Sequence, residues 1–79
     1  MEKYEESVRK ILSNIFNQDL SEFGIKKDLQ YIGMDSLNCM NIIIALEDGF
    51  KITIPEEKLG LRYIRNIYDI CKLIKEVKE

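Results

Sequence analysis

Histidine is absent from the 79 residues, and with it the commonest general base and the commonest metal ligand. The two cysteines, Cys39 and Cys71, lie far apart and form no CxxC pair, so the sequence indicates neither a zinc site nor a disulfide framework. Both fall among apolar residues with no base or cation to activate a thiol, so we expect them in the core. The sequence therefore predicts no metal site, no catalytic residue and no enzymatic activity.

Long apolar runs are lacking too. No segment approaches the roughly 20 apolar residues that span a bilayer, and the first residues, MEKYEESVRK, are too charged for a signal peptide. The net charge of −2 gives no electrostatic reason to bind nucleic acid or an anionic membrane. We therefore expect a cytoplasmic protein that binds neither.

One proline and four glycines leave room for long regular elements, and 46% hydrophobic with 33% charged residues is typical of a soluble globular chain. This length suits one small core, so we expect residues 1–79 to form a single domain. Helical periodicity predicts an amphipathic helix over residues 2–17. A long ordered loop over 17–35 should follow; it lacks the alternating acids of an EF-hand, and loops of this length are more often functional than idle.

Three further helices are expected after this loop. Residues 36–50 have a helical pattern, with Asp35 as a good N-cap. KITIP resembles a strand but has no partner strand, so we expect it to lead into a short helix near Pro55 to Leu59. The last helix should begin at Asn66, with Asp69 placed three residues on as in a capping box. The predicted fold class is an all-α four-helix bundle, with three longer helices, a short third helix and a long loop between the first two.

The helix predicted over 36–50 has apolar residues on two sides. On a helical wheel, the side that must face the core holds Cys39, Ile42, Ile43, Leu46 and Phe50. The opposite side holds polar Asn41 and Asp48 but also the apolar Leu37 and Ile44, with Met40 at its edge. Exposed apolar residues ringed by polar ones are typical of a docking surface. The alternative is a central helix that is buried nearly all round.

Ser36 stands at the start of this helix, where unpaired backbone N–H groups and the helix dipole favour an anion such as a phosphate ester. Without a histidine or a G-x-S-x-G turn, it is a poor hydrolytic nucleophile. Ser36 is therefore better suited to be the substrate of another enzyme. The alternative is that Asp35 and Ser36 only begin a helix.

Three stretches follow one another at fixed distances: IGMDSL at 32–37, ALEDGFKITIP at 45–55 and IRNIYDI at 64–70. Together they resemble the acyl carrier protein family, including its stand-alone peptidyl carrier relatives, over about residues 4–77. The resemblance implies that Ser36 bears a 4′-phosphopantetheine arm, transferred from coenzyme A by a phosphopantetheinyl transferase with Mg²⁺. It also implies a monomer whose arm holds acyl or aminoacyl thioesters for loading and elongating enzymes.

The resemblance further implies the roles of neighbouring residues. Asp35 matches the acid that helps to position the serine in the transferase, and Leu37 matches the leucine that contacts partners beside the arm. The expected partner face comprises Leu37, Met40, Asn41, Ile44, Glu47, Asp48, Glu56 and Glu57.

The chain departs from fatty-acid carriers in its charges. Asn38, Asn41 and Lys51 stand where acids are usual in those carriers, which are also more acidic than this chain. Neutral asparagines give specificity through hydrogen bonding and shape rather than through long-range attraction. This favours a dedicated carrier for polyketide, nonribosomal peptide or similar assembly over one for fatty-acid synthesis.

Two other classes of protein compete with a carrier. A helical adaptor could bind partners through Leu37, Met40 and Ile44 without modification, and it would not need the Ser36 hydroxyl. A helix-turn-helix DNA binder could use LRYIRNIY and the final lysines. The acidic balance argues against DNA binding, because affinity for phosphates needs clustered Lys and Arg.

Overall fold

The computed structural model describes residues 3–79, which form three α-helices and three short 3₁₀ segments and contain no strand. The α-helices are α1 (Glu5–Phe16), α2 (Ser36–Phe50) and α3 (Ile67–Lys78). The 3₁₀ segments are η1 (Leu29–Ile32), η2 (Glu56–Lys58) and η3 (Leu61–Tyr63). The prediction of an all-α fold is confirmed. Within residues 3–79, no helix has both the length and the apolar character needed to cross a membrane.

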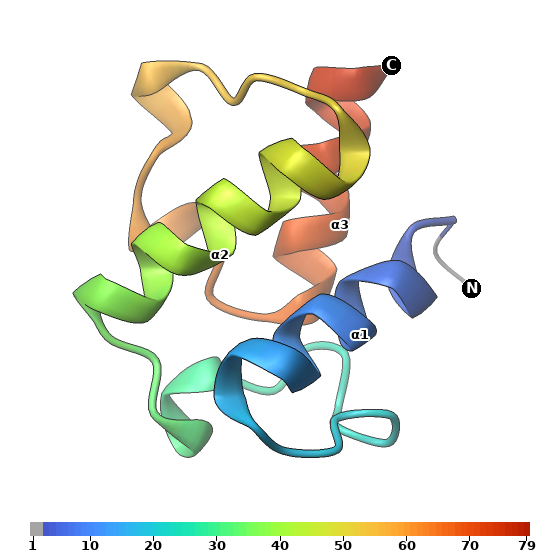
Figure 1. Ribbon diagram of the computed structural model, residues 1–79, viewed down its shortest axis with the longest axis vertical. Helices are drawn as coiled ribbons and strands as arrows, with labels where there is room; N and C mark the ends of the chain where they lie inside the picture. The colour runs from blue at the N-terminus through green and yellow to red at the C-terminus, as the bar shows by residue number, and fades with distance from the viewer. Residues whose placement is uncertain (1–2) are drawn as a thin grey trace.

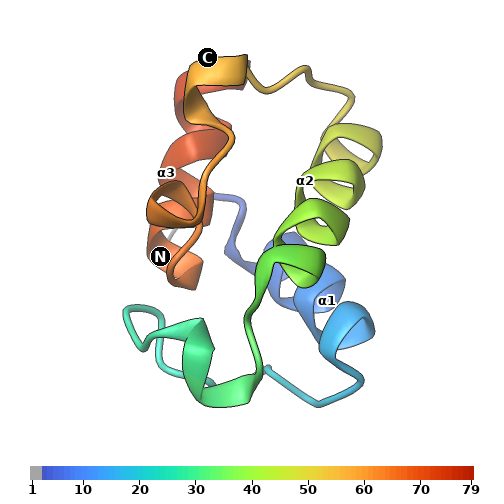
Figure 2. The same ribbon diagram turned by 90° about the vertical axis from the view of Figure 1, so that its left-hand side faces the viewer.

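The three α-helices bury their apolar stripes against one another, with α1 packed on both α2 and α3 (Figures 1 and 2). α1 begins later than the helix expected over 2–17, because residues 3 and 4 form a turn; residue 2 lies outside the described residues. Asn17 ends α1 in the left-handed conformation, with φ 54°. The core draws side chains from every α-helix and from the connections: Tyr4, Val8, Leu12, Leu20, Leu29, Cys39, Ile42, Ile43, Leu46, Ile54, Ile64, Ile67, Ile70, Cys71, Leu73 and Ile74.

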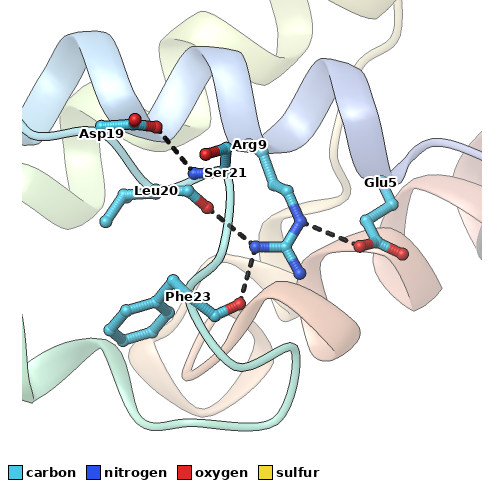
Figure 3. A network of polar contacts seen from close by, with 6 residues as sticks. All are labelled: Glu5, Arg9, Asp19, Leu20, Ser21 and Phe23. Carbon is cyan, nitrogen blue, oxygen red and sulfur yellow. Dashed lines mark hydrogen bonds and ion pairs between the residues drawn. The ribbon is translucent and has the colours of Figure 1, made fainter.

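The loop over 17–35 is held against α1 by polar contacts (Figure 3). The Arg9 guanidinium donates from Nε to Glu5 at 2.8 Å and from Nη1 to the carbonyls of Leu20 and Phe23, at 2.8 and 2.6 Å. Ser13 Oγ accepts the N–H of Leu20 at 3.0 Å. Leu20 itself is buried, so the loop begins with one apolar anchor and several hydrogen bonds.

The far half of the same loop is tied to the start of α3. The N–H of Tyr68 donates to the Ile25 carbonyl at 2.9 Å, and the N–H of Leu29 donates to the Arg65 carbonyl at 2.9 Å. Leu29 is fully buried and begins η1. The expectation of a long ordered loop is therefore confirmed, and the loop contains the short 3₁₀ segment η1.

A short helix lies where one was expected near Pro55 to Leu59, but it is only η2, a three-residue 3₁₀ segment. Pro55 is extended, with ψ 145°, and Leu59 leaves helical geometry, with φ −90° and ψ 78°. The connection over 51–66 crosses the molecule from the end of α2 to the start of α3 (Figure 1). Since an α-helix advances only about 1.5 Å per residue and an extended chain about 3.3 Å, crossing favours extended backbone. Residues 3–79 therefore form the three longer helices that were predicted, while the count of four helices is not confirmed, because the short third one is a single 3₁₀ turn.

Candidate attachment site and docking face

Ser36 is the first residue of α2 and is exposed. Asp35 is the N-cap: its carboxylate accepts the N–H of Asn38 at 2.8 Å, and its carbonyl accepts the N–H of Cys39 at 2.8 Å. Within residues 3–79 this leaves the N–H groups of Ser36 and Leu37 without a hydrogen-bond partner, as is usual at a helix start. The prediction that Asp35 caps the helix is confirmed.

The backbone leading into Ser36 is held by contacts that sequence reasoning missed. Gly33 ends η1 with φ 102°, a left-handed conformation that glycine adopts with little strain. The Asn38 side chain reaches back from α2 and donates from Nδ2 to the Gly33 carbonyl at 3.0 Å. Met34, between them, is half-buried and packs on the core. Asn38 therefore stabilises the turn in front of Ser36.

The outer face of α2 is exposed, so the alternative of a helix buried nearly all round is wrong. Leu37, Met40 and Ile44 are 70%, 60% and 59% exposed, and Asn41 and Asp48 are exposed as well. The predicted inner face is mostly buried: Cys39, Ile42, Ile43 and Leu46 are buried, and Phe50 is half-buried against the core.

The predicted acidic residues of the docking face differ in their surroundings. Glu47 is half-buried, and its Oε2 accepts the N–H of Ile54 at 2.9 Å, so its carboxylate fastens the connection after α2. No sequence pattern pointed to that contact. Asp48 is exposed near the end of α2, while Glu56 and Glu57 are exposed on η2.

The two cysteines are buried, as predicted. Burial raises the pKa of the Cys39 thiol, which disfavours the reactive thiolate. Cys39 lies one helical turn after Ser36 and is buried in the core, whereas Ser36 is exposed.

The geometry around Ser36 fits a phosphate ester. An exposed hydroxyl can be reached by another enzyme, and unpaired N–H groups at a helix start attract an anion. The Asp35 carboxylate is already bound to the first turn of α2, which lowers its freedom to approach an added phosphate.

Comparison with known proteins agrees with this geometry. Residues 6–74 match the family described as "Phosphopantetheine attachment site". Over 66 residues the chain is 35% identical to an acyl carrier protein homolog of Mycoplasma genitalium, covering 84% of this chain and 73% of the relative. It is 30% identical over 74 residues to the acyl carrier protein of Helicobacter acinonychis, with 92% of each chain covered. Over 56 residues it is 34% identical to the D-alanyl carrier protein of Streptococcus suis, with 70% of each chain covered.

The extent of these matches defines the class of protein: the chain belongs to the acyl carrier protein family. Members of this family are carriers rather than enzymes, and their cofactor is phosphopantetheine.

Proposed function

We propose that Ser36 is the attachment site of 4′-phosphopantetheine and that this carrier delivers acyl or aminoacyl groups to partner enzymes. The observation that supports the proposal most is the exposed Ser36 hydroxyl at the start of α2, beside two unpaired N–H groups. A D-alanyl carrier among the relatives is consistent with an aminoacyl cargo. When bound, the cofactor supplies a thiol that holds the cargo as a thioester.

Attachment is a transfer from coenzyme A that a phosphopantetheinyl transferase catalyses with Mg²⁺. The Ser36 oxygen forms a new bond to the phosphorus next to pantetheine, the phosphoanhydride bond breaks, and adenosine 3′,5′-bisphosphate leaves. The hydroxyl proton passes to a base on the transferase. The role of Asp35 is to hold the helix start, and thereby the serine, in place for the transferase.

Partner enzymes dock, in this proposal, on the outer face of α2 and on η2. This face comprises Leu37, Met40, Asn41, Ile44, Glu47, Asp48, Glu56 and Glu57. We further propose that residues 1–79 form a single carrier domain, that it works as a cytoplasmic monomer, and that its pathway builds a polyketide, a nonribosomal peptide or a similar product. The neutral Asn38 and Asn41 support a dedicated pathway over fatty-acid synthesis.

An unmodified helical adaptor is the second candidate, and the exposed Leu37, Met40 and Ile44 favour it as much as they favour a carrier. The two functions differ in their need for Ser36, because an adaptor would bind its partner without the hydroxyl.

The test is to incubate the purified protein with coenzyme A, Mg²⁺ and a broad-range phosphopantetheinyl transferase, and to measure its intact mass. We expect the gain of one phosphopantetheinyl group, and no gain for Ser36→Ala. Far-UV circular dichroism of both proteins controls for folding. Folded wild-type protein that gains no mass would contradict the carrier proposal and favour the adaptor.

A further inference from the structure

The first three turns of α2 contain no charged residue. Residues 36–46 read SLNCMNIIIAL, and their outer side presents Leu37, Met40 and Ile44, which are the three exposed large hydrophobic residues of this helix. We name Leu37, Met40, Asn41 and Ile44 the neutral stripe. It begins next to Ser36, so an enzyme that binds at the serine itself lies beside it.

The acidic residues of the docking face that belong to α2 lie far from Ser36. Asp48 is twelve residues further along α2, which is about 18 Å at about 1.5 Å per residue. Charges in solution are screened beyond roughly 8 Å at physiological ionic strength. A basic patch on a partner at Ser36 would therefore find little attraction from Asp48. The closer acid, Asp35, uses a carboxylate oxygen to cap α2.

The polar side chains near the stripe have partners inside the protein. Asn38 donates to the Gly33 carbonyl, and Glu47 accepts from the N–H of Ile54. Asn41 is exposed, and its side chain forms no hydrogen bond within residues 3–79. Asn41 is thus the one amide on the stripe that is available to a partner.

We propose that the enzymes acting at Ser36 dock on the neutral stripe through an apolar surface, with one hydrogen-bonding group aimed at Asn41, rather than through a basic patch. This inference rests on the proposed function, because it assumes that enzymes act at Ser36. Burial of Leu37, Met40 and Ile44 supplies the attraction, and apolar burial does not weaken when salt screens charges. Asn41 fixes the position of the partner along α2.

The probe is a broad-range phosphopantetheinyl transferase, with the KM for this chain measured at about 50 and about 500 mM NaCl. Coenzyme A is kept saturating. The KM for coenzyme A is also measured at both NaCl concentrations, so that an effect of salt on coenzyme A binding is separated from an effect on docking of the chain. We expect the KM for the chain to change by less than about twofold, because little of the attraction is electrostatic. A rise of about tenfold would show docking through charge and would overturn the proposal.

Alanine variants test the stripe itself. We expect Leu37→Ala and Ile44→Ala each to raise the KM about tenfold, as is typical for truncation of an apolar anchor in an interface. Leu61→Ala is the matched control: it makes the same truncation at a leucine that is 42% exposed on η3, outside the stripe. Circular dichroism confirms that each variant is folded. Stripe variants with the KM of Leu61→Ala would overturn the proposal.

A nearly isosteric change, Asn41→Asp, distinguishes the two kinds of partner most sharply. Against an apolar partner surface the new carboxylate must lose its hydration, so we expect a higher KM at both salt concentrations. A lower KM at low salt would reveal a basic partner and contradict the proposal. These outcomes are distinct from failure of the proposed function, in which the wild-type chain would gain no mass at any salt concentration.

Discussion

Arg9 joins α1 to the loop that leads to Ser36, and its side chain is only 15% exposed. It donates hydrogen bonds to two loop carbonyls, those of Leu20 and Phe23, and to the Glu5 carboxylate (Figure 3). A partly buried carbonyl that loses its donor costs free energy, because it is also shielded from water. The loop conformation therefore depends on one arginine that no motif singled out.

We expect Arg9→Met to lower the free energy of unfolding by about 2–3 kcal/mol, because charge-assisted hydrogen bonds are lost and the Phe23 carbonyl is left without a donor. The Leu20 carbonyl keeps the N–H of Phe23 as a donor at 3.3 Å. Denaturant unfolding measures the change. Lys10→Met is the matched control, since Lys10 is exposed and only pairs with Glu6 at 3.6 Å, so its loss should cost less than about 0.5 kcal/mol. Equal effects of the two variants would show that the Arg9 hydrogen bonds do not stabilise the loop.

At the scale of elements, the start of α2 is set by its own cap and by the turn before it. Asp35 caps the helix, Gly33 turns the chain, and Asn38 connects helix and turn. A Cβ added at Gly33 would meet no atom within 4 Å, so any cost of substitution comes from the backbone conformation at φ 102°. Gly49, inside α2, has no such positive φ; a Cβ there would contact Ile11 Cδ1 at 3.4 Å.

These two glycines give opposite predictions. Gly33→Ala should lower the free energy of unfolding by about 1–2 kcal/mol, the cost of left-handed backbone for a residue with a Cβ. Gly49→Ala should not lower it, because alanine favours a helix over glycine by up to about 1 kcal/mol, which offsets the close contact. Chemical denaturation of both variants checks the pair. Equal stability of Gly33→Ala and the wild type would mean that the turn before Ser36 relaxes without cost.

At the scale of the whole molecule, ion pairs and hydrogen bonds link segments that are distant in sequence. Lys58 on η2 forms an ion pair with Glu76 on α3, which fastens the connection that follows α2. At the same end of α3, Lys78 donates to the Phe50 carbonyl at 3.3 Å, and the Tyr4 hydroxyl donates to Glu79 at 2.6 Å.

The Lys58–Glu76 pair predicts a pH dependence of stability. The hydrogen bond from Lys58 lowers the pKa of Glu76 below its ordinary value of 4.5, and the bond to Glu76 raises the pKa of Lys58 above its ordinary value of 10.5. A lowered acid pKa stabilises the fold above pH 4.5, and this contribution is lost as the pH falls through the folded-state pKa. The raised pKa of Lys58 likewise stabilises the fold below pH 10.5, and this contribution is lost as the pH rises through the folded-state pKa of Lys58.

We therefore expect Glu76→Gln to melt at a lower temperature than the wild type near about pH 7, with the difference vanishing towards about pH 3. Thermal unfolding followed by circular dichroism measures it. Glu22→Gln, at an exposed acid of the loop, serves as the control. A difference that stays constant down to acid pH would show that the ion pair is not its cause.

Local sequence determined the parts of this protein that rest on contacts between near neighbours. α-Helices are closed by hydrogen bonds four residues apart, so apolar periodicity predicted α1, α2 and α3 within a few residues. N-caps act within one turn, and both predicted caps are present: Asp35 accepts from Asn38, and Asn66 accepts from the N–H of Asp69 at 2.7 Å. The exposure of Leu37 and Ile44 followed from the same periodicity. The role of Ser36 stays a prediction, supported by its place at the helix start.

Only the tertiary structure decided the features that join distant segments. Proline suited a short helix near Pro55 to Leu59, but the connection over 51–66 must cross from α2 to α3. Only one 3₁₀ turn forms over Glu56–Lys58, and the backbone at Pro55 before it is extended. The Arg9 contacts with the loop, and the contact of Glu47 with Ile54, depend on which backbone groups packing brings within reach. Helical periodicity shows on which side of a helix a charged residue lies. Its hydrogen-bond partner, however, depends on where the other segments of the chain lie. This is why Glu47, predicted to face enzymes, also holds the connection after α2.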